Sequence, residues 1–309
     1  MEHLTTRNLE GTWGTLLLPI NHDNSIDFIE LGHEIDYLVQ AEMAGIYSNG
    51  TAGEFYNQTE NEFDKIQDLL SAKCRAGNMR FQVGASHPSP IVSLERIKRC
   101  TALKPDGFQV ILPDWVPTNA EEQVNFLQTC AEAAGTIPLI LYHPPHAKVV
   151  LKPADYSRIK KEVPQIIGIK VGWGDGQWFE EMRGHTSGLA VFVPGHFLAT
   201  GIKEQLASGS YSNMACLSPQ GAVWWWQLMQ TDVDSALEVQ GRIKQFLDEF
   251  ILPLVAAGFS NPALDKFLAA VGGWSNIGTR LRWPYKWVDE STIAATRKKA
   301  AMLLPEFFQ

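Results

Sequence analysis

A single lysine, Lys170, ends the short apolar run Ile166–Ile169 in the segment IIGIKVGWGD. If this run is a buried strand, the amine lies in dry surroundings, where desolvation disfavours the ammonium form and lowers its pKa. A free amine of this kind attacks a carbonyl to form an imine, through which a C–C bond can break or form without a metal or an organic cofactor. The alternative is a lysine that snorkels at the strand end and keeps its ammonium in water.

A tyrosine, Tyr142, ends a second apolar run in the segment PLILY. Its phenol is expected at the same end of the sheet as Lys170. A tyrosine hydroxyl can relay protons during imine chemistry if a neighbour orients it, and Thr51 in the segment SNGTAGEF is placed to do so. Otherwise Tyr142 is a half-buried aromatic whose hydroxyl bonds to the backbone.

Two glycines, Gly50 and Gly53, flank Thr51 and Ala52. Their spacing predicts a tight turn that directs successive backbone N–H groups inward, which suits a bound carboxylate. The alternative is an ordinary loop between a strand and a helix, because the spacing of two glycines carries little information on its own.

Eight short apolar segments alternate with amphipathic stretches along the chain. This alternation is typical of a parallel sheet wrapped by helices, and eight strands favour a closed (β/α)₈ TIM barrel, whose active site lies at the C-terminal ends of the strands. The Ser/Thr-x-x-Glu pairs Thr59 with Glu62 and Thr118 with Glu121 predict helix starts, as does Pro153. The predicted strands are Thr12–Leu18, Gly45–Asn49, Phe81–Ala85, Gly107–Leu112, Leu139–Tyr142, Ile166–Val171, Val191–Pro194 and Asn213–Leu217.

Residues 1–230 are predicted to form the barrel, closed by a helix over Pro219–Gln230, and residues 231–309 a C-terminal helical extension packed on it. The extension has predicted helices at Asp232–Leu252, Asn261–Val271 and Ser291–Leu303, with no Gly/Ser-rich linker before it. The run Trp224–Trp226 cannot face one core entirely, because three consecutive helical positions fan over roughly 200°. We expect one of them at a subunit interface or under the C-terminal helices, with simple burial as the alternative.

The composition is that of a globular protein, with 45% hydrophobic and 19% charged residues. A net charge of −8 argues against nucleic acid and anionic membrane surfaces as partners. No secretory signal and no stretch of about 18 apolar residues is apparent, so we expect a cytoplasmic protein. The four cysteines show no CxxC pair, which favours buried, reduced thiols.

Together these segments resemble the dihydrodipicolinate synthase and N-acetylneuraminate lyase family of class I aldolases over nearly the whole chain. GTAGE at 50–54 is similar to the family's GTTGE or GSTGE segment, LYHPP at 141–145 to its LYNxP, and GIK at 168–170 to its Schiff-base lysine segment. RWPY at 282–285 resembles its RPP segment, and Tyr142 and Lys170 stand the expected 170 − 142 = 28 positions apart. The resemblance implies a lyase, usually a homotetramer and otherwise a dimer, that acts on pyruvate or a larger 2-oxo acid, with or without an aldehyde partner.

The resemblance also implies roles for individual residues. Lys170 would form the imine, Tyr142 would relay protons, and Thr51 would hold the tyrosine hydroxyl. The substrate carboxylate would meet the turn that contains Ala52 and Gly53. Further substrate contacts are predicted at Gly195, which resembles the glycine after strand seven, and at Met214, Trp115, His143 and His196.

The chain also departs from the family. Ala52 stands where a second Thr or Ser usually offers a hydroxyl, and Trp115 where the synthases have a tyrosine of the proton relay. Ala147 replaces their arginine, and His196 with Phe197 replaces the acidic pair of sialic acid lyases. Neither reaction is therefore our first choice. Trp115, Trp173, His143, His146 and His196 are instead predicted to form a bulkier, aromatic pocket.

Other functions remain open at this stage. The same lysine would serve a dehydratase or aldolase for 2-oxo-3-deoxy sugar acids. A metal-dependent lyase could use His143, His146 and His196, although two prolines between the first two prevent helical alignment and no acid completes the ligand set. A non-catalytic binding protein on the same scaffold is a further alternative.

Overall fold

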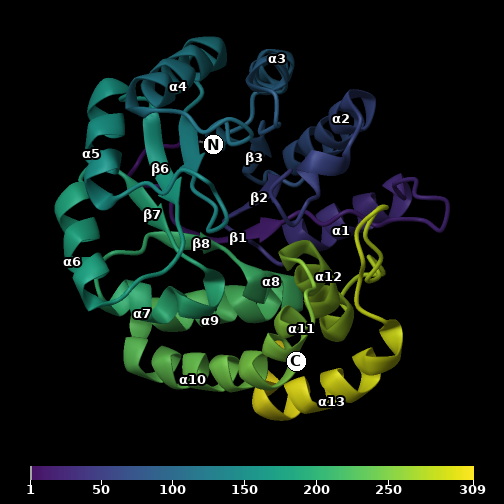
Figure 1. Ribbon diagram of the computed structural model, residues 1–309. Helices are drawn as coiled ribbons and strands as arrows, with labels where there is room; N and C mark the ends of the chain where they lie inside the picture. The colour runs from purple at the N-terminus through teal and green to yellow at the C-terminus, as the bar shows by residue number, and fades with distance from the viewer. Residues whose placement is uncertain (1) are drawn as a thin grey trace.

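The computed structural model describes residues 2–309, and its centre is a closed barrel of eight parallel strands. Each strand pairs with the next one in sequence, and the eighth pairs with the first, which confirms the predicted (β/α)₈ barrel. Figure 1 shows the helices surrounding the strands. The strands are β1 Gly11–Thr15, β2 Gly45–Ser48, β3 Phe81–Gly84, β4 Gly107–Val110, β5 Leu139–Tyr142, β6 Ile166–Lys170, β7 Ala190–Phe192 and β8 Gly209–Tyr211.

The predicted eighth strand was wrong. Asn213–Leu217 forms the short helix α8, and the strand lies just before it. Ser212 caps α8, because its side chain accepts hydrogen bonds from the N–H groups of Met214 and Ala215. The apolar run in α8 therefore packs as a helix, whereas the less apolar segment Gly209–Tyr211 pairs with β1 and β7.

Helices follow the strands, as predicted, but one start signal was misplaced. Thr59 and Glu62 form the expected capping box. The box before the fourth helix consists of Asn119 and Glu122, one residue after the predicted pair, because Asn119 has the extended backbone that a cap requires. The helices around the barrel are α1 Phe28–Gln40, α2 Glu60–Ala76, α3 Pro90–Cys100, α4 Ala120–Ala134, α5 Pro153–Glu162, α6 Gly176–His185, α7 Leu198–Lys203, α8 Asn213–Leu217 and α9 Pro219–Thr231.

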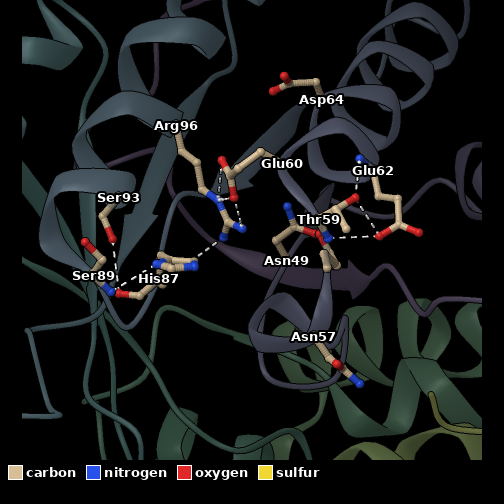
Figure 2. Close-up of polar contacts among 12 residues, drawn as sticks. Asn49, Asn57, Thr59, Glu60, Glu62, Asp64, His87, Ser89, Ser93 and Arg96 are labelled. Atoms are coloured by element: carbon tan, nitrogen blue, oxygen red, sulfur yellow. Dashed lines mark hydrogen bonds and ion pairs between the residues drawn. The ribbon is translucent and has the colours of Figure 1, made fainter. Parts of the chain in front are cut away.

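A buried arginine joins α2 to α3, as Figure 2 shows beside the Thr59 capping box. The Arg96 side chain is fully buried, and its Nη2 donates to Oε1 of Glu60 at 2.7 Å. Its Nη1 donates to the carbonyl oxygen of Ser86 at 2.6 Å, and the guanidinium lies 4.4 Å from the Phe63 ring centroid. These bonds satisfy the buried cation, which indicates a structural role.

Four helices form the C-terminal extension: α10 Val233–Phe250, α11 Leu252–Ala256, α12 Asn261–Gly272 and α13 Ile293–Leu303. The predicted helix Asp232–Leu252 thus ends earlier, at Phe250, and a short helix that begins with Leu252 and Pro253 follows it. In Figure 1, α10 lies along α9, and α12 lies against α8 at the barrel. The extension packs directly on the barrel, so that α12 reaches the strand ends.

The three tryptophans of α9 all pack within the chain. Trp225 is buried, and its Nε1 donates to the carbonyl oxygen of Ala236 in α10 at 3.0 Å. Trp224 is half-buried, with its ring 6.5 Å from that of Phe307. Trp226 is also half-buried and lies next to Gly11 of β1. Packing under the C-terminal segments therefore accounts for Trp224 and Trp225 without a partner subunit.

Two further expectations concern the state of the cysteines and membrane-spanning segments. All four cysteines are free, buried and helical, which agrees with the prediction of buried thiols. Among residues 2–309, no helix combines the length and the apolar character needed to cross a membrane.

Candidate active site

Lys170 lies at the C-terminal end of β6, directly beside Tyr142 of β5 in the barrel register. Its amine faces aromatic rings from three strands. Nζ is 4.1 Å from the ring centroid of Tyr142 and 5.3 Å from those of Tyr47 on β2 and Tyr211 on β8. The apolar residues that precede Lys170 build the barrel wall, and the rings surround the amine.

Burial lowers the pKa of Lys170 from 10.5 to about 8, against smaller opposing effects of Asp265 and Cys216. The amine has no hydrogen-bond or ion-pair partner among residues 2–309, so only aromatic faces and the nearby carboxyl stabilise its charge. About one tenth of the amine is therefore uncharged at pH 7, far more than for a lysine with the ordinary pKa. An uncharged amine is the nucleophile that imine formation requires.

Tyr142 and Thr51 lie together beside the lysine. Thr51 lies in the loop that follows β2, and its Oγ1 is 3.5 Å from the hydroxyl oxygen of Tyr142 on β5. Burial raises the pKa of Tyr142, and the hydrogen bond with Thr51 lowers it by a smaller amount. The phenol is thus protonated at neutral pH and can donate a proton to a group bound on Lys170.

The loop that carries Thr51 and Ala52 is a tight turn. Asn49 and Glu54 adopt left-handed backbone conformations at its two ends, with φ of 52° and 51°. A Cβ at Gly50 would lie 2.5 Å from the Tyr47 ring, so only glycine fits there. The N–H groups of Thr51 and Ala52 donate to no acceptor within residues 2–309, and both residues border the cavity.

A buried ion pair fixes this loop to the extension. Lys266 of α12 donates from Nζ to Oε1 of Glu54 at 2.7 Å, and both side chains are almost fully buried. Lys266 also donates to the carbonyl oxygen of Arg280, and the second Glu54 oxygen accepts from the N–H of Arg282. The contacts of Glu54 therefore fix the turn to the extension, while the N–H groups of Thr51 and Ala52 remain open to the cavity.

The cavity has a volume of about 500 Å³ and is lined by residues of the barrel and of the extension. Lys170, Tyr142 and Thr51 line the side formed by the strand ends. The extension contributes six apolar side chains to the lining: Leu247, Ile251, Leu252, Val255, Leu264 and Leu268.

Gly195 and His196 line the cavity after β7. The N–H of His196 donates to Oδ1 of Asn213, which orients the Asn213 amide so that its Nδ2 donates to Nδ1 of the imidazole. Nδ1 is then the acceptor and Nε2 carries the proton. Burial lowers the pKa of His196, so the ring is a neutral hydrogen-bond donor.

Several predicted site residues lie elsewhere, and the aromatic-pocket hypothesis is not supported by their positions. Trp115 is 80% exposed, and Lys148 lies over its ring. His143 is bonded through its ring nitrogens to the Tyr156 hydroxyl and the Val149 carbonyl, because the chain turns away from the mouth after Tyr142. Four further predicted residues do not line the cavity: Met214, which is fully buried, Gly53, which is buried within the turn, His146, which is exposed, and Trp173, which stacks on Phe197.

The alternative interpretation, a metal site formed by three histidines, has no geometric counterpart. Of the three histidines, only His196 borders the cavity. Within residues 2–309, no three His, Cys, Asp or Glu side chains are grouped so that they could hold a metal ion.

Sequence reasoning missed three residues that surround the lysine. Tyr47 and Tyr211 supply two of the rings, and Asp265 of α12 lines the cavity that Lys170 lines. The detectable signal was the pair Asp265–Lys266 inside the apolar helical run PALDKFLAAV, where a charged residue must face either a partner or a cavity. Tyr211 was missed because the eighth strand was misplaced.

The chain is similar in sequence to known lyases. The N-acetylneuraminate lyase of Gallus gallus is 28% identical over 170 residues, which cover 53% of this chain and 54% of that protein. The N-acetylneuraminate lyase of Escherichia coli is 21% identical over 312 residues, which cover 97% of this chain and 98% of that protein.

Solved structures share the fold. The CdNal protein of Clostridium difficile, solved in complex with mannosamine, has a TM-score of 0.82 at 17% identity and covers 97% of this chain and 99% of its own. An Escherichia coli prophage protein of the dihydrodipicolinic acid synthase family, solved with pyruvate, has a TM-score of 0.82 at 19% identity, with 96% and 98% covered.

A family profile also matches nearly the whole chain. The description "Dihydrodipicolinate synthetase family" applies to residues 8–295, which include the barrel, the cavity and most of the extension. The chain therefore belongs to the dihydrodipicolinate synthetase family.

Proposed function

We propose that Lys170 is the Schiff-base residue of this enzyme and that its substrate is a 2-oxo acid larger than pyruvate. The chain is a class I lyase or aldolase of its family, which acts on pyruvate or a larger 2-oxo acid through an imine. The observation that carries the assignment is the amine of Lys170, held among three aromatic rings at the cavity with a pKa of about 8.

The chemistry follows from the neighbours of the amine. Uncharged Nζ attacks the ketone carbon, and the resulting carbinolamine loses its hydroxyl as water after it receives a proton. Tyr142 is the donor in this proposal, since it lies beside Lys170 in the register and its hydroxyl is near Thr51. The iminium then withdraws electrons from the adjacent carbon, so that a bond to the next carbon can break or form.

The free N–H groups of Thr51 and Ala52 are proposed to bind the substrate carboxylate. Backbone N–H groups at a tight turn make such a site without a cationic side chain. Ala52 contributes no hydroxyl there. Gly195 and the Nε2–H of His196, in the segment that follows β7, are proposed to be further contacts of the substrate.

The cavity supports a substrate larger than pyruvate. Its volume of about 500 Å³ exceeds what a three-carbon acid occupies, and leucine and isoleucine side chains of the extension form an apolar part of its wall. A 2-oxo acid with a partly apolar substituent would place its carboxylate at the turn and its substituent against this wall. The aldehyde formed by cleavage would leave through the same opening.

The assembly and location are further parts of the proposal. A homotetramer or dimer is supported by the adjacent exposed residues Trp115 and Val116, whose side chains are 80% and 73% exposed and could be covered by a second copy. A cytoplasmic location is compatible with four free thiols. Measurement of molar mass by light scattering tests the assembly, and a monomer would contradict it.

Trapping with borohydride tests the function. The protein is incubated with pyruvate and a series of longer 2-oxo acids, reduced, and measured by intact mass and peptide mapping. We expect one irreversible adduct on Lys170, none in Lys170→Met, and an unchanged adduct in the matched control Lys148→Met, whose lysine lies outside the cavity. No adduct in the wild type, or an adduct in Lys170→Met, would contradict the proposal, and loss of turnover on chelation would favour a metal-dependent lyase.

A further inference from the structure

A buried carboxyl, Asp265, faces the active-site cavity from the extension. It lies in the first half of α12, is only 8% exposed, and lines the same cavity as Lys170 and Tyr142. Within residues 2–309 it forms no hydrogen bond and no ion pair. A buried carboxyl without a partner is costly, so its presence calls for an explanation other than stability.

Three titratable groups on the surrounding elements interact with the charge of Asp265. Lys170 of β6 has the opposite charge, whereas Tyr142 of β5 and Cys216 of α8 are neutral when protonated. Asp265 and Lys170 border one cavity but do not form an ion pair, which leaves cavity space next to both. A substrate joined to Lys170 would extend into that space.

We propose that Asp265 is a further catalytic residue, the base that removes a proton from carbon 3 of the 2-oxo acid once its ketone carbon is joined to Lys170. The inference rests on the proposed function, because it requires the imine. Its geometric basis is an unpartnered carboxyl on the wall of the cavity that Lys170, Tyr142 and Tyr211 also line, with the amine of Lys170 close to the rings of both tyrosines.

The step balances without any further reactant. The C–H bond at carbon 3 breaks, and its electron pair becomes the double bond between carbons 2 and 3. The π pair of the C=N bond becomes the lone pair of the lysine nitrogen, and the proton moves to the Asp265 carboxylate. The products are a neutral enamine and a neutral carboxylic acid, and the reverse step returns the proton.

Electrostatics favours Asp265 over Tyr142 for this role. Burial raises the pKa of Asp265 to about 7 and also raises that of Tyr142, so the carboxyl is the better base at neutral pH. The iminium, a fixed cation, keeps the carboxylate ionised. Its charge disappears as the enamine forms, and the carboxyl then prefers to hold the proton.

Deuterium exchange into the pyruvate methyl group tests this step with a known compound. The full-length protein is incubated with pyruvate in deuterium oxide, and loss of the methyl proton signal is followed by NMR. We expect Asp265→Asn and Asp265→Leu to exchange at least about 100-fold more slowly than the wild type while both still form the borohydride-trapped adduct. Leucine suits the apolar neighbours Leu264 and Leu268, so it serves where asparagine impairs folding.

Two controls complete the experiment. Asp248→Asn removes a carboxylate from the exposed rim of the same cavity and should exchange like the wild type. Asp265→Glu keeps the carboxyl and should recover part of the rate. Exchange by Asp265→Asn within threefold of the wild type would overturn the inference while the imine stands, as would loss of the trapped adduct in both Asp265 variants. Failure to trap the wild-type protein would instead overturn the proposed function.

Discussion

Asp265 and Lys266 are neighbours on α12, and both are buried, yet they meet opposite surroundings. Lys266 donates to Glu54 at 2.7 Å and to the carbonyl of Arg280 at 2.6 Å. Asp265 has no partner and borders the cavity. One helix thus carries a lysine whose charge is paired and which fixes the turn at Thr51 and Ala52, and an aspartate whose charge has no partner. The comparison indicates that a buried charge with a partner stabilises the structure, whereas a buried charge without a partner is available for chemistry.

Loss of the paired cation should have the largest effect. Lys266→Met leaves the Glu54 carboxylate buried without a cation, and we expect the free energy of unfolding to fall by about 3–5 kcal/mol. Denaturant titration followed by tryptophan fluorescence measures this change. The control is Lys244→Met, because Lys244 is 66% exposed in its pair with Asp248 and should contribute less than about 1 kcal/mol.

A second variant separates the missing partner from lost packing. Glu54→Gln in the Lys266→Met background removes the uncompensated carboxylate, so part of the lost stability should return. If the double variant is as unstable as Lys266→Met, the role assigned to this ion pair is wrong.

Loss of the unpaired carboxyl should have the opposite sign. Burial raises the pKa of Asp265 from 3.8 to about 7, so protonation is favoured in the folded state. The contribution of Asp265 to the free energy of unfolding is therefore largest below the pKa of this carboxyl in the unfolded chain, near 4. It is lost as the pH rises toward 7. Asp265→Asn avoids the loss, and we expect a gain on the order of 1–3 kcal/mol at pH 8.

Thermal unfolding at several pH values checks this expectation. The Tm difference between Asp265→Asn and the wild type should grow between about pH 4 and 7 and then remain constant. If Asp265→Asn is less stable than the wild type at pH 8, Asp265 stabilises the structure, as Lys266 does.

The pH dependence of imine formation sharpens the comparison on the cavity side. Since the pKa of Lys170 is about 8, the initial rate of adduct formation should rise about tenfold per pH unit below 8 and level above it. Rates measured by mass spectrometry after cyanoborohydride reduction give the midpoint. In Asp265→Asn the midpoint should move to lower pH, because the carboxylate favours the lysine cation. A midpoint near 10.5 would mean a solvated amine.

The sequence predicted the barrel and the central residues because they depend on local patterns. Apolar runs that end in Lys170 and Tyr142 place both side chains at the same strand ends in any parallel barrel. Asp265 could not be placed in this way, since its position depends on how α12 packs against α8. Trp115 and His143 lie in loops beyond the strands, where strand register does not determine the direction of a side chain.

The smallest expected effect concerns the turn that Lys266 supports. Ala52→Ser adds a hydroxyl next to the free N–H groups, and one more hydrogen bond to a carboxylate contributes about 1 kcal/mol, or roughly fivefold in Kd. The pyruvate concentration that gives half-maximal trapping measures this change. Ala52→Gly keeps the N–H without the hydroxyl and should bind pyruvate as the wild type does. Equal affinities for all three proteins would place the carboxylate elsewhere in the cavity, and the buried Glu54–Lys266 pair would then support the fold alone.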